Sequence, residues 1–235
     1  PDAPLVTGKL EIPFLSAKVD YLQTTYHVYN EAVTFNANNI DVGEMKLFDE
    51  NNDVASARGQ ISHDHLDDFQ FNLSVATDRF EGLKTTQKDN TLFYGTAEAG
   101  GLIQFLGPLD NMEIRASVTS RHGTQISIPI NSGTSVADRS FIRYMKKGND
   151  SLNYTFTSTG MIKGLRLNFD LDITPDAEIK IIFDQKAGDI IKGNGNGNIR
   201  MEIDPKGDFN MYGTYTIERG DYLFTLQNFF NKYFS

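Results

Sequence analysis

The chain contains 235 residues, no cysteine and a formal net charge of −9 at neutral pH. The lack of cysteine excludes disulfides, thiolate metal sites and cysteine nucleophiles, and no apolar run reaches the roughly 18 residues that a membrane-spanning helix needs. The acidic balance argues against nucleic acid as a partner, because such binding takes its affinity from lysine and arginine side chains that neutralise phosphates.

Apolar residues alternate with polar ones along most of the chain, and this period of two is typical of strands with one buried face. In residues 165–173, leucine, phenylalanine or isoleucine occupies every odd position, and charged or amide side chains fill the even positions. The same pattern predicts, in chain order, strands at 69–75, 112–118, 126–130, 152–156, 165–173, 179–183, 199–203, 209–217 and 222–226. Turn-forming sequences such as 204–207 separate them, so we expect an all-β fold of antiparallel strands joined by hairpins.

A short helix or irregular link is expected at residues 135–147, where Ser135 and Asp138 form a candidate capping box ahead of apolar residues. The sequence on either side shares an order of motifs, since an alternating strand precedes a Tyr-Gly-Thr triplet in both. We therefore expect two related β units, at 1–134 and 148–235, that stack in one continuous, elongated fold. The chain begins without a methionine and ends without a turn or cap signal, so we expect a fragment of a longer protein.

Two short motifs suggest chemistry but have simpler interpretations. His63, His65 and Asp67 have nearly the spacing of zinc ligands in metallo-β-lactamase-like hydrolases, yet Asp68 stands where that motif needs a histidine, and a polar hairpin turn explains the cluster. The alternating glycines and asparagines at 193–198 resemble a phosphate-binding loop, but a strand pattern follows them instead of a helix. A flexible turn or a glycine-rich strand edge is the better interpretation, and the sequence predicts no enzymatic activity, metal or cofactor.

The alternating apolar residues allow two structures. Two such faces packed against each other form the core of a β-sandwich, whereas a single curved sheet leaves its inner face as an apolar trough. Periodicity alone favours the sandwich.

The C-terminal residues 213–232, above all Gly-Asp-Tyr-Leu-Phe-Thr-Leu-Gln-Asn at 220–228, resemble the C-terminal domain of TamB proteins in its Bacteroidetes-type form. Earlier segments agree with this family in the same order: 19–26, 59–63, 89–97 and 126–130. The resemblance implies an elongated, U-shaped open antiparallel sheet, the β-taco, with an apolar inner trough. It also implies an inner-membrane anchor outside these residues, a periplasmic location for this part, and a partnership with TamA or another BamA-type outer-membrane barrel protein.

The function implied by the resemblance is a conduit or scaffold between the two membranes, which carries phospholipid acyl chains and supports outer-membrane protein assembly. Exposing an acyl chain to water costs ~0.8 kcal/mol per methylene, so transport needs a continuous apolar surface. The residues expected to line that surface are Phe69, Phe71, Leu73, Val75, Leu167, Phe169, Leu171, Ile173, Ile179, Ile181, Phe183, Ile199, Met201, Ile203, Phe209, Met211, Tyr215, Ile217, Tyr222, Phe224 and Leu226. A chaperone for nascent outer-membrane strands is the alternative, and a zinc hydrolase that uses His63, His65 and Asp67 is a third hypothesis.

Overall fold

A computed structural model describes residues 5–130, 156–157, 164–184, 188–206, 208–226 and 230–234. Within these residues the chain forms strands, one short 3-10 helix (Leu109–Asn111) and no α-helix. The strands are β1 (Gly8–Val19), β2 (Thr24–Phe35), β3 (Asn39–Phe48), β4 (Val54–Asp64), β5 (Asp67–Thr85), β6 (Tyr94–Pro108), β7 (Glu113–Ser120), β8 (Gln125–Pro129), β9 (Phe156–Thr157), β10 (Arg166–Ile173), β11 (Glu178–Asp184), β12 (Asp189–Ile203), β13 (Asp208–Leu226) and β14 (Phe230–Phe234). The all-β prediction is confirmed, whereas the link expected at 135–147 lies outside the described residues.

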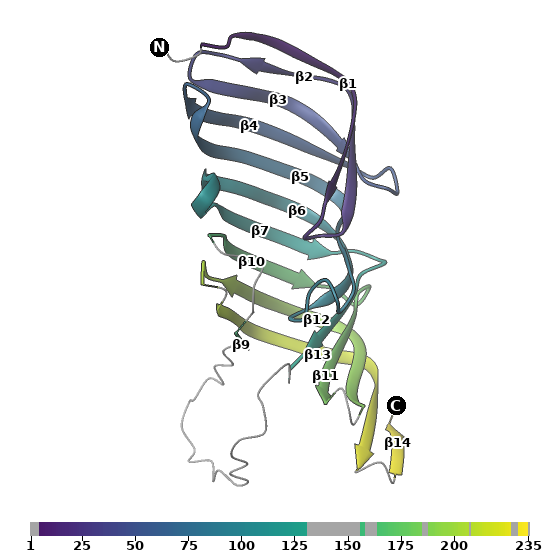
Figure 1. Ribbon diagram of the computed structural model, residues 1–235. Coiled ribbons are helices and arrows are strands. Elements are labelled where there is room, and N and C mark those ends of the chain that lie inside the picture. The colour runs from purple at the N-terminus through teal and green to yellow at the C-terminus, as the bar shows by residue number, and fades with distance from the viewer. Residues whose placement is uncertain are drawn as a thin grey trace.

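All of these strands belong to one sheet, which extends from β1 at one end to β13 and β14 at the other (Figure 1). Strands β1 to β7 follow one another in chain order, and each pairs antiparallel with the next. Because a single sheet contains every described strand, the β-sandwich that periodicity alone favoured is wrong.

Six strands of the sheet close a ring of pairings, in the order β6, β7, β10, β12, β11 and β8, with β8 returning to β6. Two of these pairings, β7 with β10 and β8 with β11, are parallel, since a long stretch of chain connects the partners instead of a hairpin. The prediction of an open and wholly antiparallel sheet is therefore wrong for this part of the molecule, where the sheet closes as a six-stranded barrel. Strands β1 to β5 extend the sheet beyond the ring.

Bulges and glycines bend the long strands. The pairing of β5 with β6 shifts between Thr77 and Phe80, and the pairing of β12 with β13 shifts between Asn194 and Gly195. Such bulges add local twist and turn the strand. The glycine-rich run at 193–198 lies in the middle of β12, which pairs with β10 and β11 on one side and with β13 on the other. The predicted flexible turn or strand edge is therefore wrong.

The glycines of β12 bring its backbone close to that of β13. A Cβ atom added at Gly195 would overlap the carbonyl oxygen of Thr216, and one added at Gly197 would press on the ring of Tyr215. The Tyr215 hydroxyl donates a hydrogen bond to the Gly193 carbonyl oxygen (3.0 Å), which fastens the two strands at the bend. The glycines of β12 therefore allow its backbone to pack closely against that of β13.

Replacement of Gly195 by alanine is expected to lower the free energy of unfolding by about 1–3 kcal/mol, because a methyl group must force two paired backbones apart. The control is Gly82→Ala in β5, where the nearest atom to an added Cβ is 3.9 Å away, and the expected change is below about 1 kcal/mol. Urea unfolding followed by circular dichroism measures both. Equal effects of the two substitutions would contradict the close approach at Gly195.

Candidate functional site

The most extensive feature of the sheet is a row of apolar side chains that crosses eight neighbouring strands. Because paired residues of adjacent strands point to the same face, the registers of β3, β4, β5, β6, β7, β10, β12 and β13 align one residue from each. The first row consists of Met45, Ala57, Val75, Ile103, Ala116, Phe169, Met201 and Met211. Every member is apolar.

Parallel rows lie on either side of the first. The second row consists of Leu73, Phe105, Ile114, Leu167, Ile203 and Phe209. The third row consists of Leu47, Ala55, Thr77, Gly101, Val118, Leu171, Ile199 and Gly213. We call these three rows the apolar face.

The opposite side of the same strands is polar. The row one residue away from the first consists of Glu44, Arg58, Ser74, Gln104, Arg115, Asn168, Glu202 and Asn210. We call this side the polar face. A sheet with one face of each kind across eight strands separates water from an apolar surface along its whole width.

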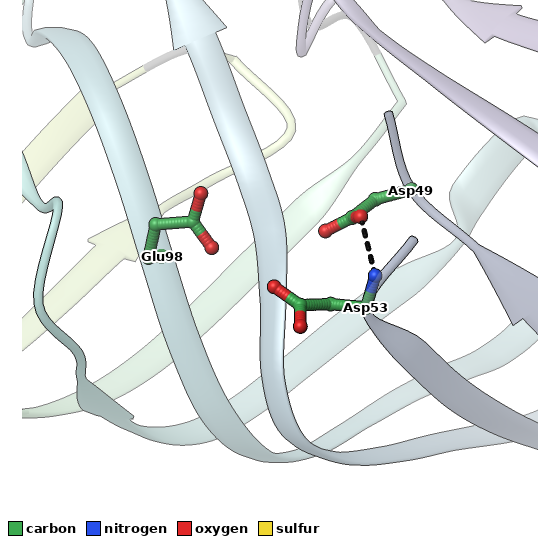
Figure 2. A group of neighbouring side chains, drawn as sticks. All are labelled: Asp49, Asp53 and Glu98. Carbon is green, nitrogen blue, oxygen red and sulfur yellow. Dashed lines mark hydrogen bonds between the residues drawn. The ribbon is translucent and has the colours of Figure 1, made fainter. Parts of the chain in front are cut away.

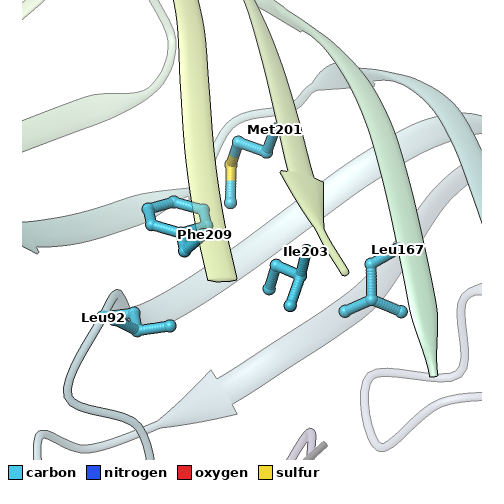
Figure 3. Close-up of a cluster of buried hydrophobic side chains, with 5 residues drawn as sticks. All are labelled: Leu92, Leu167, Met201, Ile203 and Phe209. Atoms are coloured by element: carbon cyan, nitrogen blue, oxygen red, sulfur yellow. The ribbon is translucent and has the colours of Figure 1, made fainter. Parts of the chain in front are cut away.

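The apolar face is buried at two places and half-exposed between them. Leu167, Met201, Ile203 and Phe209 form a buried cluster together with Leu92, which comes from the connection between β5 and β6 (Figure 3). Apart from Met45, the other large members of the face are half-buried and retain contact with solvent: Leu47, Leu73, Val75, Ile103, Phe105, Ile114, Val118, Phe169, Leu171, Ile199 and Met211. A second buried cluster of Val28, Met45 and Ala57 lies toward β2.

The remaining residues of the predicted lining occupy several places. Phe71 lies next to the second row, where it pairs with Ile61 of β4 and Gly107 of β6. Ile173 of β10 and Tyr215 of β13 pair with Gly197 from its two sides. Pairing aligns Ile181 with Ile191 and Tyr222, and Ile179 with Gly193. Phe183 lies at the register shift of β11, between Ile182 and Asp184, and so does not align with these pairs. Phe69 contacts His63 at the β4–β5 hairpin, Ile217 is exposed opposite Gly195, and the backbones of Phe224 and Leu226 pair with β14.

Sequence reasoning missed several members of the apolar face. It assigned no lining residue to β3, β4, β6 or β7, which contribute Met45, Ala57, Ile103 and Ala116. Alternation at 112–118 predicted the strand that contains Ala116, but its apolar residues were not assigned to the same face as the lining residues of the other strands. Leu92 lies in a connection without periodicity, and no local signal marked it.

The histidine cluster is a tight hairpin turn. Asp64 pairs with Asp67, and the two residues between them, His65 and Leu66, both have positive φ angles of 51° and 64°. That geometry is the type I′ turn that joins two adjacent strands. His63 Nδ1 accepts a hydrogen bond from the Leu66 N–H (3.2 Å), and His65 Nδ1 lies 2.6 Å from an Asp64 carboxylate oxygen. Within the described residues, His63, His65 and Asp67 do not converge as a metal-ligand group.

One group of acidic side chains in the described part of the chain does converge, formed by Asp49, Asp53 and Glu98 (Figure 2). Asp49 has a structural role, because its carboxylate accepts hydrogen bonds from the backbone N–H groups of Asn51 (2.8 Å), Asp53 (2.9 Å) and Glu81 (2.8 Å). The Arg79 guanidinium lies 3.3 Å from Asp53 and 3.5 Å from Glu98. The group therefore fastens the β3–β4 turn to β5 and β6.

Two buried carboxyl groups give this region a pH dependence. Burial raises the pKa of Glu81 and that of Glu98, although Lys84 and Arg79 respectively oppose the shift. A carboxyl with a raised folded-state pKa binds its proton more tightly in the folded state, so its contribution to stability grows as the pH falls from neutral toward that pKa. Below the unfolded-state pKa the contribution is complete.

Glu81→Gln is therefore expected to raise the thermal midpoint at pH 7 and to lose this advantage near pH 4, where Glu81 itself is neutral. Melting curves of both proteins between pH 4 and 8 measure the difference. The control is Glu44→Gln, which removes the same charge from an exposed position and should leave the thermal midpoint at pH 7 nearly unchanged. A Glu81→Gln protein that is less stable than the parent at pH 7 would mean that the ion pair with Lys84 (3.6 Å) outweighs burial.

Comparisons with known proteins add one match. Residues 44–235 match the family model of the TamB C-terminal domain. No curated protein and no solved structure is significantly similar to the chain. No helix in the described part of the chain has the length and apolar character needed to cross a membrane.

Proposed function

The chain belongs to the TamB C-terminal domain family, and from this premise we propose that its apolar face carries phospholipid acyl chains between the inner and outer membranes. The family gives the chain a role in the translocation and assembly module, in outer-membrane biogenesis, together with an outer-membrane partner. The lipid cargo, the periplasmic location of this part and a TamA- or BamA-type barrel as the partner are our proposals. We propose no catalytic step.

The observation that carries the proposal is the first row of the apolar face. Eight strands give seven spacings of ~4.8 Å, so the row is roughly 34 Å long when measured along the curved sheet, similar to the thickness of a bilayer's hydrocarbon core. An acyl chain that moves along such a row avoids the cost of ~0.8 kcal/mol per exposed methylene at each step. The polar face keeps the other side of the sheet in water.

The apolar surface continues to the edge of the sheet. Leu10 and Leu15 of β1 pair with Val33 and Val28, both of which belong to the second apolar cluster or pack against it. Leu10 is nevertheless 51% exposed, because β1 pairs only with β2 among the described strands. We propose that acyl chains reach the apolar face across this edge.

The direct test is lipid analysis of the purified chain. Organic extraction and mass spectrometry should find phospholipid bound to it, and the chain should accelerate transfer of labelled phosphatidylethanolamine between vesicles of phosphatidylethanolamine and phosphatidylglycerol. Absence of both bound lipid and transfer would overturn the proposal.

The free edge of β1 favours a second candidate, a chaperone that receives nascent outer-membrane strands by β-augmentation. An extended partner strand would pair with the unpaired backbone groups of β1 and lay apolar side chains beside Leu10 and Leu15. Photo-crosslinkers at Leu10 and at Phe169 distinguish the two functions, because capture of an unfolded barrel protein at Leu10 supports the chaperone and capture of lipid at Phe169 supports the conduit.

A further inference from the structure

The connection between β5 and β6, residues 86–93, lies on the apolar face. Its Leu92 side chain is only 7% exposed and shares a cluster with Leu167, Ile203 and Phe209 (Figure 3). The ring centroid of the next residue, Phe93, is 6.2 Å from that of Phe209. Two apolar side chains from a loop thus cover three strands of the surface to which we assign the acyl chains.

Hydrogen bonds within this loop hold it in the shape that presents Leu92 and Phe93. The Asp89 carboxylate accepts bonds from the Thr86 N–H (2.7 Å) and the Thr86 hydroxyl (2.6 Å). The Asn90 side-chain oxygen accepts the N–H of Leu92 (2.9 Å) and that of Phe93 (3.4 Å). The loop can therefore move as a unit without losing its internal bonds.

The residues around the loop include contacts that hold it on the apolar face and buried polar atoms that oppose this position. The β1–β2 turn lies beside it: the Lys84 N–H at the end of β5 donates a hydrogen bond to the Leu22 carbonyl oxygen (2.8 Å), and Tyr21 packs against the same cluster as Leu92. Within the described residues, three buried polar atoms in or beside the loop have no hydrogen-bond partner: the Tyr21 hydroxyl, Thr85 Oγ1 and Asn90 Nδ2. An unpaired buried polar atom disfavours the state that buries it, so apolar contacts hold the loop closed against a polar penalty.

We propose that residues 86–93 form a gate that occupies the acyl-chain surface at Leu167, Ile203 and Phe209 and is displaced by the cargo. This inference rests on the proposed function and adds a regulatory step to it. Leu92 and Phe93 bury the same kind of surface as an acyl chain and compete for the same place. The apparent affinity for lipid is then the affinity of the open state multiplied by the fraction of molecules in which the loop is open.

The first experiment opens the gate. Leu92→Ser combined with Phe93→Ser is expected to bind nitrobenzoxadiazole-labelled phosphatidylethanolamine about tenfold more tightly than the parent chain, because the loop no longer competes with the acyl chains. The control is Leu109→Ser in the 3-10 helix, an apolar residue that is 65% exposed and away from the face; its affinity should equal that of the parent. Unchanged or weaker binding by the folded double variant would overturn the gate.

The second experiment locks the gate and does not depend on the serine variant folding. The chain has no cysteine, so Phe93→Cys with Met211→Cys, two half-buried residues that pack against this cluster, offers a single pair for a short, reducible thiol cross-linker. We expect the cross-linked protein to transfer the labelled lipid at least about tenfold more slowly than after reduction. Equal rates before and after reduction would overturn the gate while leaving the conduit intact. No binding and no transfer by any form, the parent included, would overturn both.

Discussion

Replacement of Phe209 by alanine is expected to lower the free energy of unfolding by about 3–5 kcal/mol, the range for deleting a large buried aromatic side chain. Phe209 is 1% exposed and is among the largest fully buried side chains of the described residues. It contacts the cluster formed by three strands and the β5–β6 connection, so its loss leaves a cavity that neither side closes easily. The effect approaches the whole stability of many domains.

The matched control lies on the same strand. Tyr212, three residues further along β13, is 45% exposed and belongs to the polar face, where it pairs with Arg200. Tyr212→Ala removes a similar volume and is expected to cost less than about 1 kcal/mol, because exposed substitutions leave no cavity. Urea unfolding of the three proteins provides the comparison. Similar losses for the two variants would show that the cluster around Phe209 does not organise the fold.

Alternation predicted the strands because successive side chains of a strand point to opposite faces, so every second residue faces the apolar surface. It located β10 within one residue, since 165–173 was expected and Arg166–Ile173 was found. It shortened β12, which was expected at 199–203 and extends over Asp189–Ile203. The additional residues include the glycines at 193, 195 and 197, which have no side chain and so leave no alternation to detect. Their partners on β13 reveal the strand only once the pairing is known.

The order of the strands in the sheet was beyond sequence reasoning. Hairpin pairing is local, and β1 to β7 follow it. The parallel pairing of β7 with β10 joins residues about fifty positions apart, such as Ala116 and Phe169, and alternation says nothing about which edges meet. The ring of six strands depends on that pairing, so neither the alternation nor the family resemblance, which implied an open antiparallel sheet, predicted the closed ring.

The residues named from the sequence include members of the apolar face on β5, β10, β12 and β13 and none on β3, β4, β6 or β7. Large residues such as Phe169 and Met201 stand out in an alternating pattern, whereas Ala57 and Ala116 contribute little hydrophobicity and were not assigned to the lining. Both alanines nevertheless complete the first row, where their small side chains sit between larger neighbours. Only the register shows that the row is unbroken.

Introduction of a charge into the first row at Ile103 is expected to have the largest functional effect. Ile103 is half-buried at the centre of the row, between Val75 of β5 and Ala116 of β7. A glutamate there must either lose its hydration or keep water on the surface that an acyl chain needs, and burying an unpaired charge costs several kcal/mol. We expect Ile103→Glu to slow transfer of labelled phosphatidylethanolamine by at least about tenfold.

The adjacent residue, Gln104, provides a control that separates the effect of the apolar face from the effect of the added charge. Gln104→Glu adds the same charge one position along β6, but Gln104 belongs to the polar face, between Ser74 and Arg115. It should leave transfer unchanged, and Ile103→Gln, which is polar but neutral, should fall between the two. Urea unfolding of each variant separates loss of transport from loss of folding. If the two glutamate variants slow transfer equally while both remain folded, the charge of the protein controls the rate and the cargo does not travel on the apolar face.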